Sequence, residues 1–216
     1  MSADRSGPTH AGPTQVGILV FPEVEVLDFA GPFEAFSVTR LNEERRYETG
    51  SPFAVSLVAE SLEPVRASGG LRVLPDYRLE ECPALRILVV PGGMGTRVEV
   101  NNAKLIDWIR RQAAGAELVT SVCTGSFLLA RAGLLDGRTA TTHWRSLDRF
   151  EGDFPAVVVD RDQHVVTGDR ILTSAGVSAG IDMALRVVAR LHGETVARSS
   201  ARHMEYPYPD SNARRI

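Results

Sequence analysis

Four short apolar runs rich in β-branched residues constrain the fold of this chain more than any other feature. They are QVGILVF at 15–21, FAVSLVA at 53–59, LRILVV at 85–90 and ELVTSV at 117–122. Nearly continuous apolar runs are typical of parallel strands that are buried on both faces. Stretches with helical spacing lie between and after them, at 26–38, 104–114, 125–132 and 177–191. This alternation predicts an α/β fold, a doubly wound and mostly parallel sheet with helices on both faces.

The rest of the chain fits one domain. Runs at 157–159 and 170–174 predict two further strands, and neither a repeat nor a linker divides the 216 residues. We expect a single domain over 15–216, after a disordered leader at 1–14 that is polar and rich in Gly and Pro. The charged connection at 41–52 is interpreted as a solvated loop, with a lid near a site as the alternative.

Charge and composition exclude several kinds of partner. The net charge is −3 and no block of Lys and Arg occurs, so nucleic acid is not an expected partner. No apolar run approaches the roughly 20 residues of a membrane span, and the first residues lack the apolar centre of a signal peptide. The two cysteines, Cys82 and Cys123, do not resemble the disulfide framework of a secreted protein. We therefore expect a cytoplasmic protein with no membrane partner.

Cys123 is the strongest candidate for a reactive side chain. It lies in VCTGS at 122–126, where an apolar strand ends and a helix of small residues begins. A tight turn of this kind is typical of a nucleophile elbow, in which the side chain is exposed above the sheet near helix N–H groups. The helix N-terminus predicts a pKa of the thiol below its ordinary value of about 8.5. The alternative is a small buried apolar side chain.

Two other segments are expected at the same edge of the sheet. PGGMG at 91–95 follows directly on a strand, and its glycines, Gly92 and Gly93, would let backbone N–H groups approach a developing negative charge. Asp28, in LDFAGP at 27–32, follows the first strand and has apolar neighbours. Partial burial would raise the pKa of its carboxyl, so that it could exchange a proton with a thiolate. An ordinary acid at a helix N-terminus is the alternative.

The remaining cysteine and the histidines predict less. Cys82 lies between two acids and a proline in EECP and is interpreted as structural. His143, in TTHW, could reach the site or could be a structural histidine. No spacing of His, Cys and Asp resembles a metal site. The other histidines are interpreted as surface groups: His10, His164, His192 and His203.

PGG at 91–93 together with TSVCTGSFLLARAGLLDGRTATTHW at 120–144 resembles the ThiJ/PfpI superfamily, which is similar to class I glutamine amidotransferases. Within it, FPEVEVLDFAGPFEAF, GVSAGIDMALRVVARLHGETVA and HMEYPYPD are most similar to isonitrile hydratases, so the resemblance covers 15–210. It implies a flavodoxin-like fold, a homodimer, a small-molecule substrate, and neither a metal nor an organic cofactor.

The resemblance also implies roles for single residues. Cys123 would be the nucleophile, Asp28 its partner acid, and Thr124 the residue beside the nucleophile. Gly92 and Gly93 would lie near the backbone that stabilises an anion. Isonitrile hydratases convert an isonitrile and water into an N-substituted formamide, here through a Cys123 thioimidate. Proteases and glyoxalases of the superfamily commonly have His after the nucleophile, and Thr124 in that position argues against both activities.

One other branch shares the same motifs. The sensory domains of AraC-type transcription regulators also contain PGG and THW, and the connection at 41–52 is similar to theirs. Those regulators carry a helix-turn-helix module, and because this sequence ends at 216 we expect an enzyme rather than a ligand sensor. A redox sensor, in which Cys123 is oxidised, is a further alternative.

Overall fold

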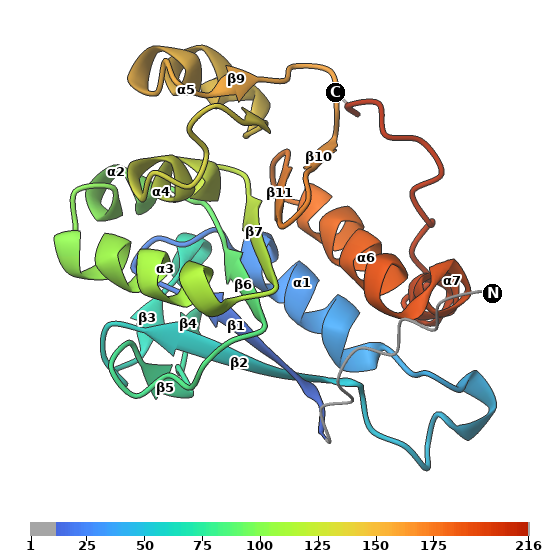
Figure 1. Ribbon diagram of the computed structural model, residues 1–216. Coiled ribbons are helices and arrows are strands. Elements are labelled where there is room, and N and C mark those ends of the chain that lie inside the picture. The colour runs from blue at the N-terminus through green and yellow to red at the C-terminus, as the bar shows by residue number, and fades with distance from the viewer. Residues whose placement is uncertain (1–11, 216) are drawn as a thin grey trace, which may run out of the picture.

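The computed structural model describes residues 12–215, and its centre is a seven-stranded sheet with the strand order β10–β11–β7–β6–β1–β2–β5 (Figure 1). All neighbouring strands are parallel except β10 and β11. The predicted doubly wound, mostly parallel sheet is therefore confirmed. The strands are β1 (Thr14–Leu19), β2 (Phe53–Ala59), β5 (Tyr77–Arg78), β6 (Ile87–Val90), β7 (Leu118–Val122), β10 (Val165–Thr167) and β11 (Ile171–Ser174).

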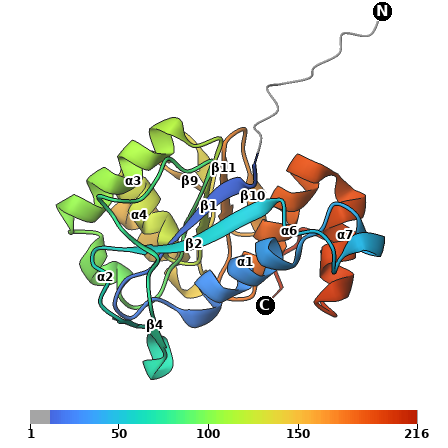
Figure 2. The same cartoon turned by 90° about the horizontal axis from the view of Figure 1, so that it is seen from below.

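Helices cover both faces of this sheet (Figures 1 and 2). On one face lie α1 (Val26–Val38), α6 (Ala179–His192) and α7 (Glu194–His203). On the other lie α2 (Thr96–Glu99), α3 (Ala103–Gly115) and α4 (Gly125–Arg131). Close packing depends on local sequence: a side chain at Gly180 would meet both methyl groups of Val122 at 3.1 Å, so this glycine lets α6 approach β7. The apolar stripes predicted from the sequence are thus buried against the sheet.

Several short elements were not predicted or lie elsewhere than predicted. The run at 157–159 forms β9 (Val158–Val159), which pairs with β8 (Thr139–Ala140) outside the central sheet. The antiparallel edge strand β10 was missed because its three residues are too few to show a period. The other short elements are η1 (Glu43–Arg45), β3 (Val65–Arg66), η2 (Ser68–Gly70), β4 (Arg72–Val73), η3 (Trp144–Ser146) and α5 (Leu147–Asp153).

The charged connection at 41–52 lies far from the carboxyl edge of the sheet. It joins the end of α1 to the start of β2, which is beside the start of β1. Arg46 is buried, donates to Val38 O at 2.7 Å and forms an ion pair with Glu43 at 2.5 Å. Ser199 of α7 donates to Glu43 at 2.9 Å. The connection is therefore a docked loop at the amino edge and cannot act as a lid over Cys123.

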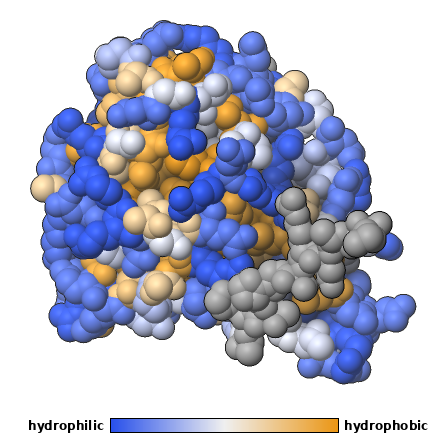
Figure 3. All heavy atoms as spheres, in the orientation of Figure 1, coloured by the Kyte–Doolittle hydropathy of each residue, from blue (hydrophilic) through white to orange (hydrophobic). Residues whose placement is uncertain are grey.

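Residues 1–11 of the predicted leader lie outside the described residues, and β1 begins at Thr14, one residue before the expected strand. No helix within residues 12–215 is long and apolar enough to cross a bilayer. On the face seen in Figure 3, hydrophobic side chains gather near a hollowed centre, inside a mostly hydrophilic periphery.

Candidate active site

Cys123 lies at the turn between β7 and α4. Its φ of 55° is in the left-handed region, which side chains other than glycine rarely adopt. The strained turn is held by backbone bonds, because the Cys123 N–H donates to Ala175 O at 3.0 Å. The residue is only 6% exposed. The geometry is that of a nucleophile elbow, as the sequence predicts, with a more deeply buried thiol than expected.

Asp28 lies in the first turn of α1 and is completely buried. Its Oδ2 accepts a hydrogen bond of 2.9 Å from the Gly92 N–H, whereas Oδ1 has no hydrogen-bond partner among residues 12–215. Burial raises the pKa of Asp28 to about 8, against the opposing effect of the Gly92 N–H; the charge of Glu25 raises it further. The neighbouring Cys123 thiol and the Val177 N–H act in the opposite direction. Asp28 therefore carries a proton at neutral pH, which an acid in a solvated helix cap would not do.

Burial also raises the pKa of the Cys123 thiol above its ordinary value, and the charge of Asp28 adds to this effect. The N–H and the hydroxyl of Thr124 lower the pKa but do not compensate. The expectation of a low thiol pKa is therefore wrong for the resting protein, because the effect of the helix N-terminus is smaller than the loss of solvation. The thiol and the carboxyl form one coupled pair, and both are neutral at rest.

Gly92 and Gly93 bring the turn after β6 against the elbow. A side chain at Gly92 would meet Thr124 N at 2.5 Å and Cys123 Cβ at 2.9 Å, so only glycine fits there. The Gly93 N–H donates to Thr124 Oγ1 at 3.0 Å, and Thr96 of α2 donates to the same oxygen at 3.0 Å. Both glycine N–H groups are therefore already occupied, one by Asp28 and one by Thr124. An anion-stabilising role for them stays a prediction that requires one of these bonds to be exchanged.

Sequence reasoning missed Val177. Its φ is 55°, an unusual conformation for a β-branched residue, and it lies just before α6 with its N–H near Asp28. The strained turns at Cys123 and Val177 thus hold the thiol and the carboxyl from two sides. The only available signal was the run GVSAG at 176–180, which reads as an ordinary helix start.

His143 lies near the site without a direct bond to either reactive group. Its Cδ2 packs so closely on Gly176 that a side chain at that glycine would collide with it. Its Nδ1 accepts from the Arg145 N–H at 3.2 Å, and its ring stacks on Trp144 with 5.8 Å between centroids. Burial lowers the pKa of His143, so the ring is neutral near pH 7. Cys82, in contrast, is half-buried with a pKa raised to about 11 by burial.

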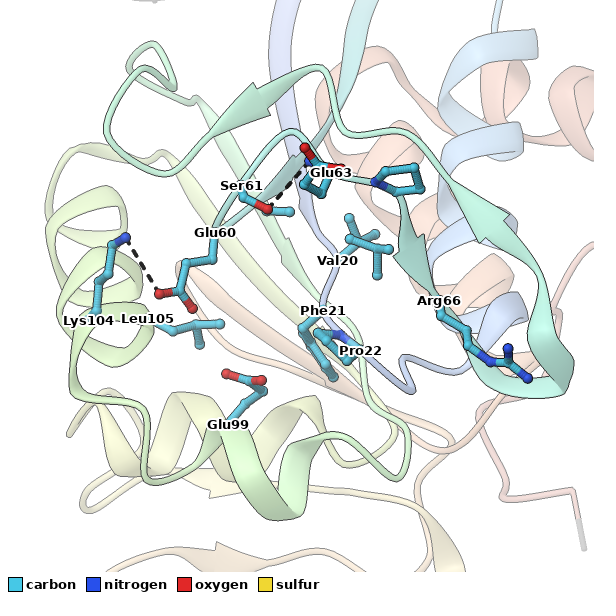
Figure 4. Close-up of a pocket in the computed structure, with 13 residues that line it drawn as sticks. Val20, Phe21, Pro22, Glu60, Ser61, Glu63, Arg66, Glu99, Lys104 and Leu105 are labelled. Carbon is cyan, nitrogen blue, oxygen red and sulfur yellow. Dashed lines mark hydrogen bonds and ion pairs between the residues drawn. The ribbon is translucent and has the colours of Figure 1, made fainter.

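A large cavity of about 630 Å³ lies at the same edge of the sheet (Figure 4). Val20, Phe21 and Leu105 supply apolar walls, and Glu60 pairs with Lys104 at its rim. Neither Cys123 nor Asp28 lines it. No cluster of three metal-ligating side chains occurs within the described part of the chain.

The fold and the site together define an α/β protein that carries a cysteine on a strand-to-helix elbow beside a buried carboxylic acid. The sequence matches the DJ-1/PfpI family over residues 14–190. The chain therefore belongs to the DJ-1/PfpI family.

Two kinds of relative are similar to this chain. Isonitrile hydratase of Pseudomonas putida is 38% identical over 89% of this chain and 78% of its own length. The HTH-type transcriptional regulators CdhR and GbdR of Pseudomonas aeruginosa are 39% and 30% identical, over 62% and 88% of this chain. The chain spans only 39% and 50% of these regulators' lengths.

Solved structures agree with the fold. A ThiJ/PfpI family protein from Pseudomonas syringae has a TM-score of 0.79 and 34% identity, covering 93% of this chain and 78% of that one. DJ-1beta of Drosophila melanogaster has a TM-score of 0.75 at 20% identity, covering 91% of this chain and 100% of that one. The second likeness concerns the fold alone.

Proposed function

We propose that this protein is a cytoplasmic, cysteine-dependent hydro-lyase of the isonitrile hydratase type, which adds water to an isonitrile to give an N-substituted formamide. The observation that carries the proposal is the buried Asp28 carboxyl, which accepts a hydrogen bond from the Gly92 N–H and lies beside the Cys123 thiol. The 38% identity to an isonitrile hydratase over most of both chains supports the same reaction.

In the first step the thiol adds to the terminal carbon of the isonitrile. The sulfur forms a bond to that carbon while Asp28 delivers its proton to the same carbon, and the thiol proton replaces the one that Asp28 has given. The product is a thioimidate, R–N=CH–S–Cys123, with no atom gained or lost. A carboxyl with a pKa of about 8 is suited to this exchange, because it holds a proton at neutral pH and releases it readily.

In the second step water attacks the thioimidate carbon. The protonated Asp28 gives its proton to the thioimidate nitrogen, and the carboxylate that remains takes a proton from the attacking water. The carbon–sulfur bond then breaks, and the proton of the new hydroxyl group passes to the departing sulfur, which gives R–NH–CHO and the free thiol. The Thr124 N–H and hydroxyl act on the Cys123 sulfur, as their effect on its pKa indicates, and would stabilise the leaving thiolate.

Turnover of a simple alkyl isonitrile by the purified protein tests this proposal. Loss of the isonitrile stretch in the infrared spectrum and appearance of the formyl proton in NMR should follow the same time course. In ¹⁸O-labelled water the formamide oxygen should carry the label. Absence of turnover above the rate without protein, with alkyl and aryl isonitriles alike, would contradict the proposal.

The second candidate function is a ligand- or redox-sensing domain. Its support is the 30% identity to GbdR over 88% of this chain. A redox sensor needs a thiolate that oxidants reach, and the buried Cys123 with its raised pKa does not favour that reaction. A ligand sensor would bind a small molecule without consuming it, which the same NMR experiment distinguishes from hydration.

We also propose that the protein is a homodimer. Leu62, Leu71 and Leu74 near the β3–β4 ribbon are exposed, at 49%, 46% and 68%, and a second copy would cover them. Sedimentation at micromolar concentration should give twice the mass of the chain. A monomeric mass would contradict the dimer without affecting the proposed reaction.

A further inference from the structure

A second, smaller cavity of about 180 Å³ lies beside the elbow at the start of α6. Its walls come from residues 143–144 and 175–178, from His164, and from the C-terminal pair Arg214 and Arg215. The pair comes from a segment that crosses from α7 back towards β10 (Figure 1). None of these C-terminal residues was expected to belong to a site.

The cavity is contiguous with the backbone that holds the reactive pair. Ala175 lines it and accepts the Cys123 N–H. Val177 lines it too, and its N–H acts on Asp28. Thr142 donates to Cys123 O at 2.9 Å, and its own carbonyl accepts from Arg214 at 3.2 Å. Neither Cys123 nor Asp28 lines the cavity itself, but both contact residues of its wall.

Arg214 gives the cavity a positive charge without a carboxylate partner. Its guanidinium donates to the carbonyls of Thr142 and Arg161 and to the Thr141 hydroxyl, and it forms no ion pair within residues 12–215. Asp160 and Asp162 act on it only as more distant charges, and burial lowers its pKa. A guanidinium nevertheless stays protonated near pH 7. A partly desolvated cation held by three neutral oxygens still favours an anion.

The other charges of the cavity are balanced. Asp182, which is 1% exposed, pairs with Arg215 and accepts from the Tyr206 hydroxyl at 2.8 Å. His164 is 6% exposed, and neither of its ring nitrogens has a hydrogen bond within the described residues, although Nε2 lies 3.3 Å from Asp182. Burial lowers the pKa of His164, so the ring is neutral. Both ring nitrogens are inaccessible, so His164 contributes to the wall of the cavity and supplies no hydrogen-bond donor to it.

The first turn of α6 adds a further preference for negative charge. Residues 177 and 178 precede this helix of 14 residues and line the cavity, so the positive end of its dipole lies there. A guanidinium and a helix N-terminus thus converge on a space large enough for only a few heavy atoms.

We infer that this cavity is a subsite for a carboxylate carried by the small molecule that reacts at Cys123. The inference rests on the proposed function in naming the substrate, because it makes the preferred isonitriles those with a carboxylate close to the isocyano group. An alkyl chain without charge would leave the Arg214 guanidinium without an anionic partner, so it would gain less from the same cavity.

A matched pair of substrates tests the inference. Isocyanoacetate carries the carboxylate, and its methyl ester has nearly the same shape without the charge. We expect kcat/KM for the acid to exceed that for the ester at least about tenfold, the size of one charged hydrogen bond. In Arg214→Gln the ratio of kcat/KM for the acid to kcat/KM for the ester should fall about tenfold or more. In Arg214→Lys the ratio should lie between those of wild type and Arg214→Gln. Equal ratios in wild type and Arg214→Gln would overturn the subsite.

Arg110→Gln is the control variant. Arg110 also bonds a backbone carbonyl, that of Ala132, but it lies on α3 across the sheet and should leave the ratio unchanged. Thermal melting shows whether Arg214→Gln is folded. If it is not, the comparison of Arg214→Lys with wild type decides, and an unchanged ratio there would equally overturn the subsite.

Binding of the product separates this inference from the proposed function. N-formylglycine and its methyl ester are titrated against the fluorescence of Trp144, which lines the cavity, with Trp144→Phe to assign the signal. Stronger binding of the acid than of the ester, lost in Arg214→Gln, would support the carboxylate subsite even if no isonitrile is hydrated. The absence of hydration would then contradict the proposed reaction alone. Hydration of both isonitriles, with no preference for isocyanoacetate or N-formylglycine over the corresponding methyl ester, would contradict the subsite alone.

Discussion

A hydrogen bond of 2.9 Å from the Gly92 N–H to Asp28 Oδ2 ties the turn after β6 to the helix after β1. It occupies one oxygen of the acid and leaves the other without a hydrogen-bond partner among residues 12–215, close to the Cys123 thiol. The strand order reverses between β1 and β6, and open α/β sheets bind ligands in the crevice at such a point. The topology therefore brings the acid, the glycine turn and the elbow to one place.

Replacement of Cys123 should abolish isonitrile hydration while the protein stays folded. Alanine removes the nucleophile, and the small change in volume should shift the melting temperature by only a few degrees. Intact-mass analysis after alkylation should show loss of the modification at this position. Cys82→Ala is the control and should retain wild-type turnover. More than a trace of activity in Cys123→Ala would rule out a covalent route.

Asp28→Asn should lower hydration by a general-acid contribution of about 10²–10⁴-fold. The amide keeps the shape of the carboxyl and can still accept from Gly92, but it cannot transfer a proton. Turnover is measured with Glu34→Gln as the control, since Glu34 is an exposed acid on the same helix and should have no effect. Near-wild-type turnover in Asp28→Asn would exclude Asp28 as the acid.

The same substitution should stabilise the protein increasingly as pH rises. In the unfolded chain the carboxyl ionises near 3.8, whereas the folded pKa is about 8. Between these values the folded state holds a proton that the unfolded state has lost, so the free energy of unfolding falls as pH rises. The slope from this group is at most about 1.4 kcal/mol per pH unit.

Urea unfolding at several pH values across this window checks the sign. The stability of Asp28→Asn relative to wild type should increase from acidic to slightly alkaline pH. A difference that is constant with pH would show that Asp28 ionises normally in the folded protein.

Alkylation of Cys123 should be slow at neutral pH and should still be accelerating above about pH 9. Burial and the Asp28 charge both raise the pKa of the thiol above its ordinary value. In Asp28→Asn the midpoint should move to lower pH, because the carboxylate charge is gone. The rate is followed by mass spectrometry in a Cys82→Ala background. A wild-type midpoint below about pH 8 would restore the low pKa that the sequence suggests.

Gly92→Ala should damage both stability and turnover. Its methyl group would meet Thr124 N at 2.5 Å and Thr124 Oγ1 at 2.7 Å, and the backbone of a strained elbow cannot easily move away. We expect a loss of about 1–3 kcal/mol in the free energy of unfolding. Gly115→Ala is the matched control, since a side chain there meets nothing within 4 Å. Equal behaviour of the two variants would show that the turn after β6 is not tightly packed on Cys123.

The sequence by itself determined the class of fold and the edge of the sheet at which the candidate site residues lie. Apolar runs such as 85–90 and 117–122 are short, nearly continuous and rich in β-branched residues, which is typical of buried parallel strands, and residues that follow such strands share one edge of the sheet. Cys123, Asp28, Thr124, Gly92 and Gly93 do come together there. These inferences hold because they depend on local pattern and on topology.

Only the tertiary structure decided the protonation of the site and its further surroundings. The low thiol pKa expected from a helix N-terminus was wrong because burial, which depends on everything packed around Cys123, has the larger effect. The strain at Val177 could not be read from its neighbours, because a left-handed valine persists only where the surrounding fold imposes it. Likewise, nothing local connects Arg214 with Thr142, since their contact exists only after the C-terminal segment has folded back across α6 and β10.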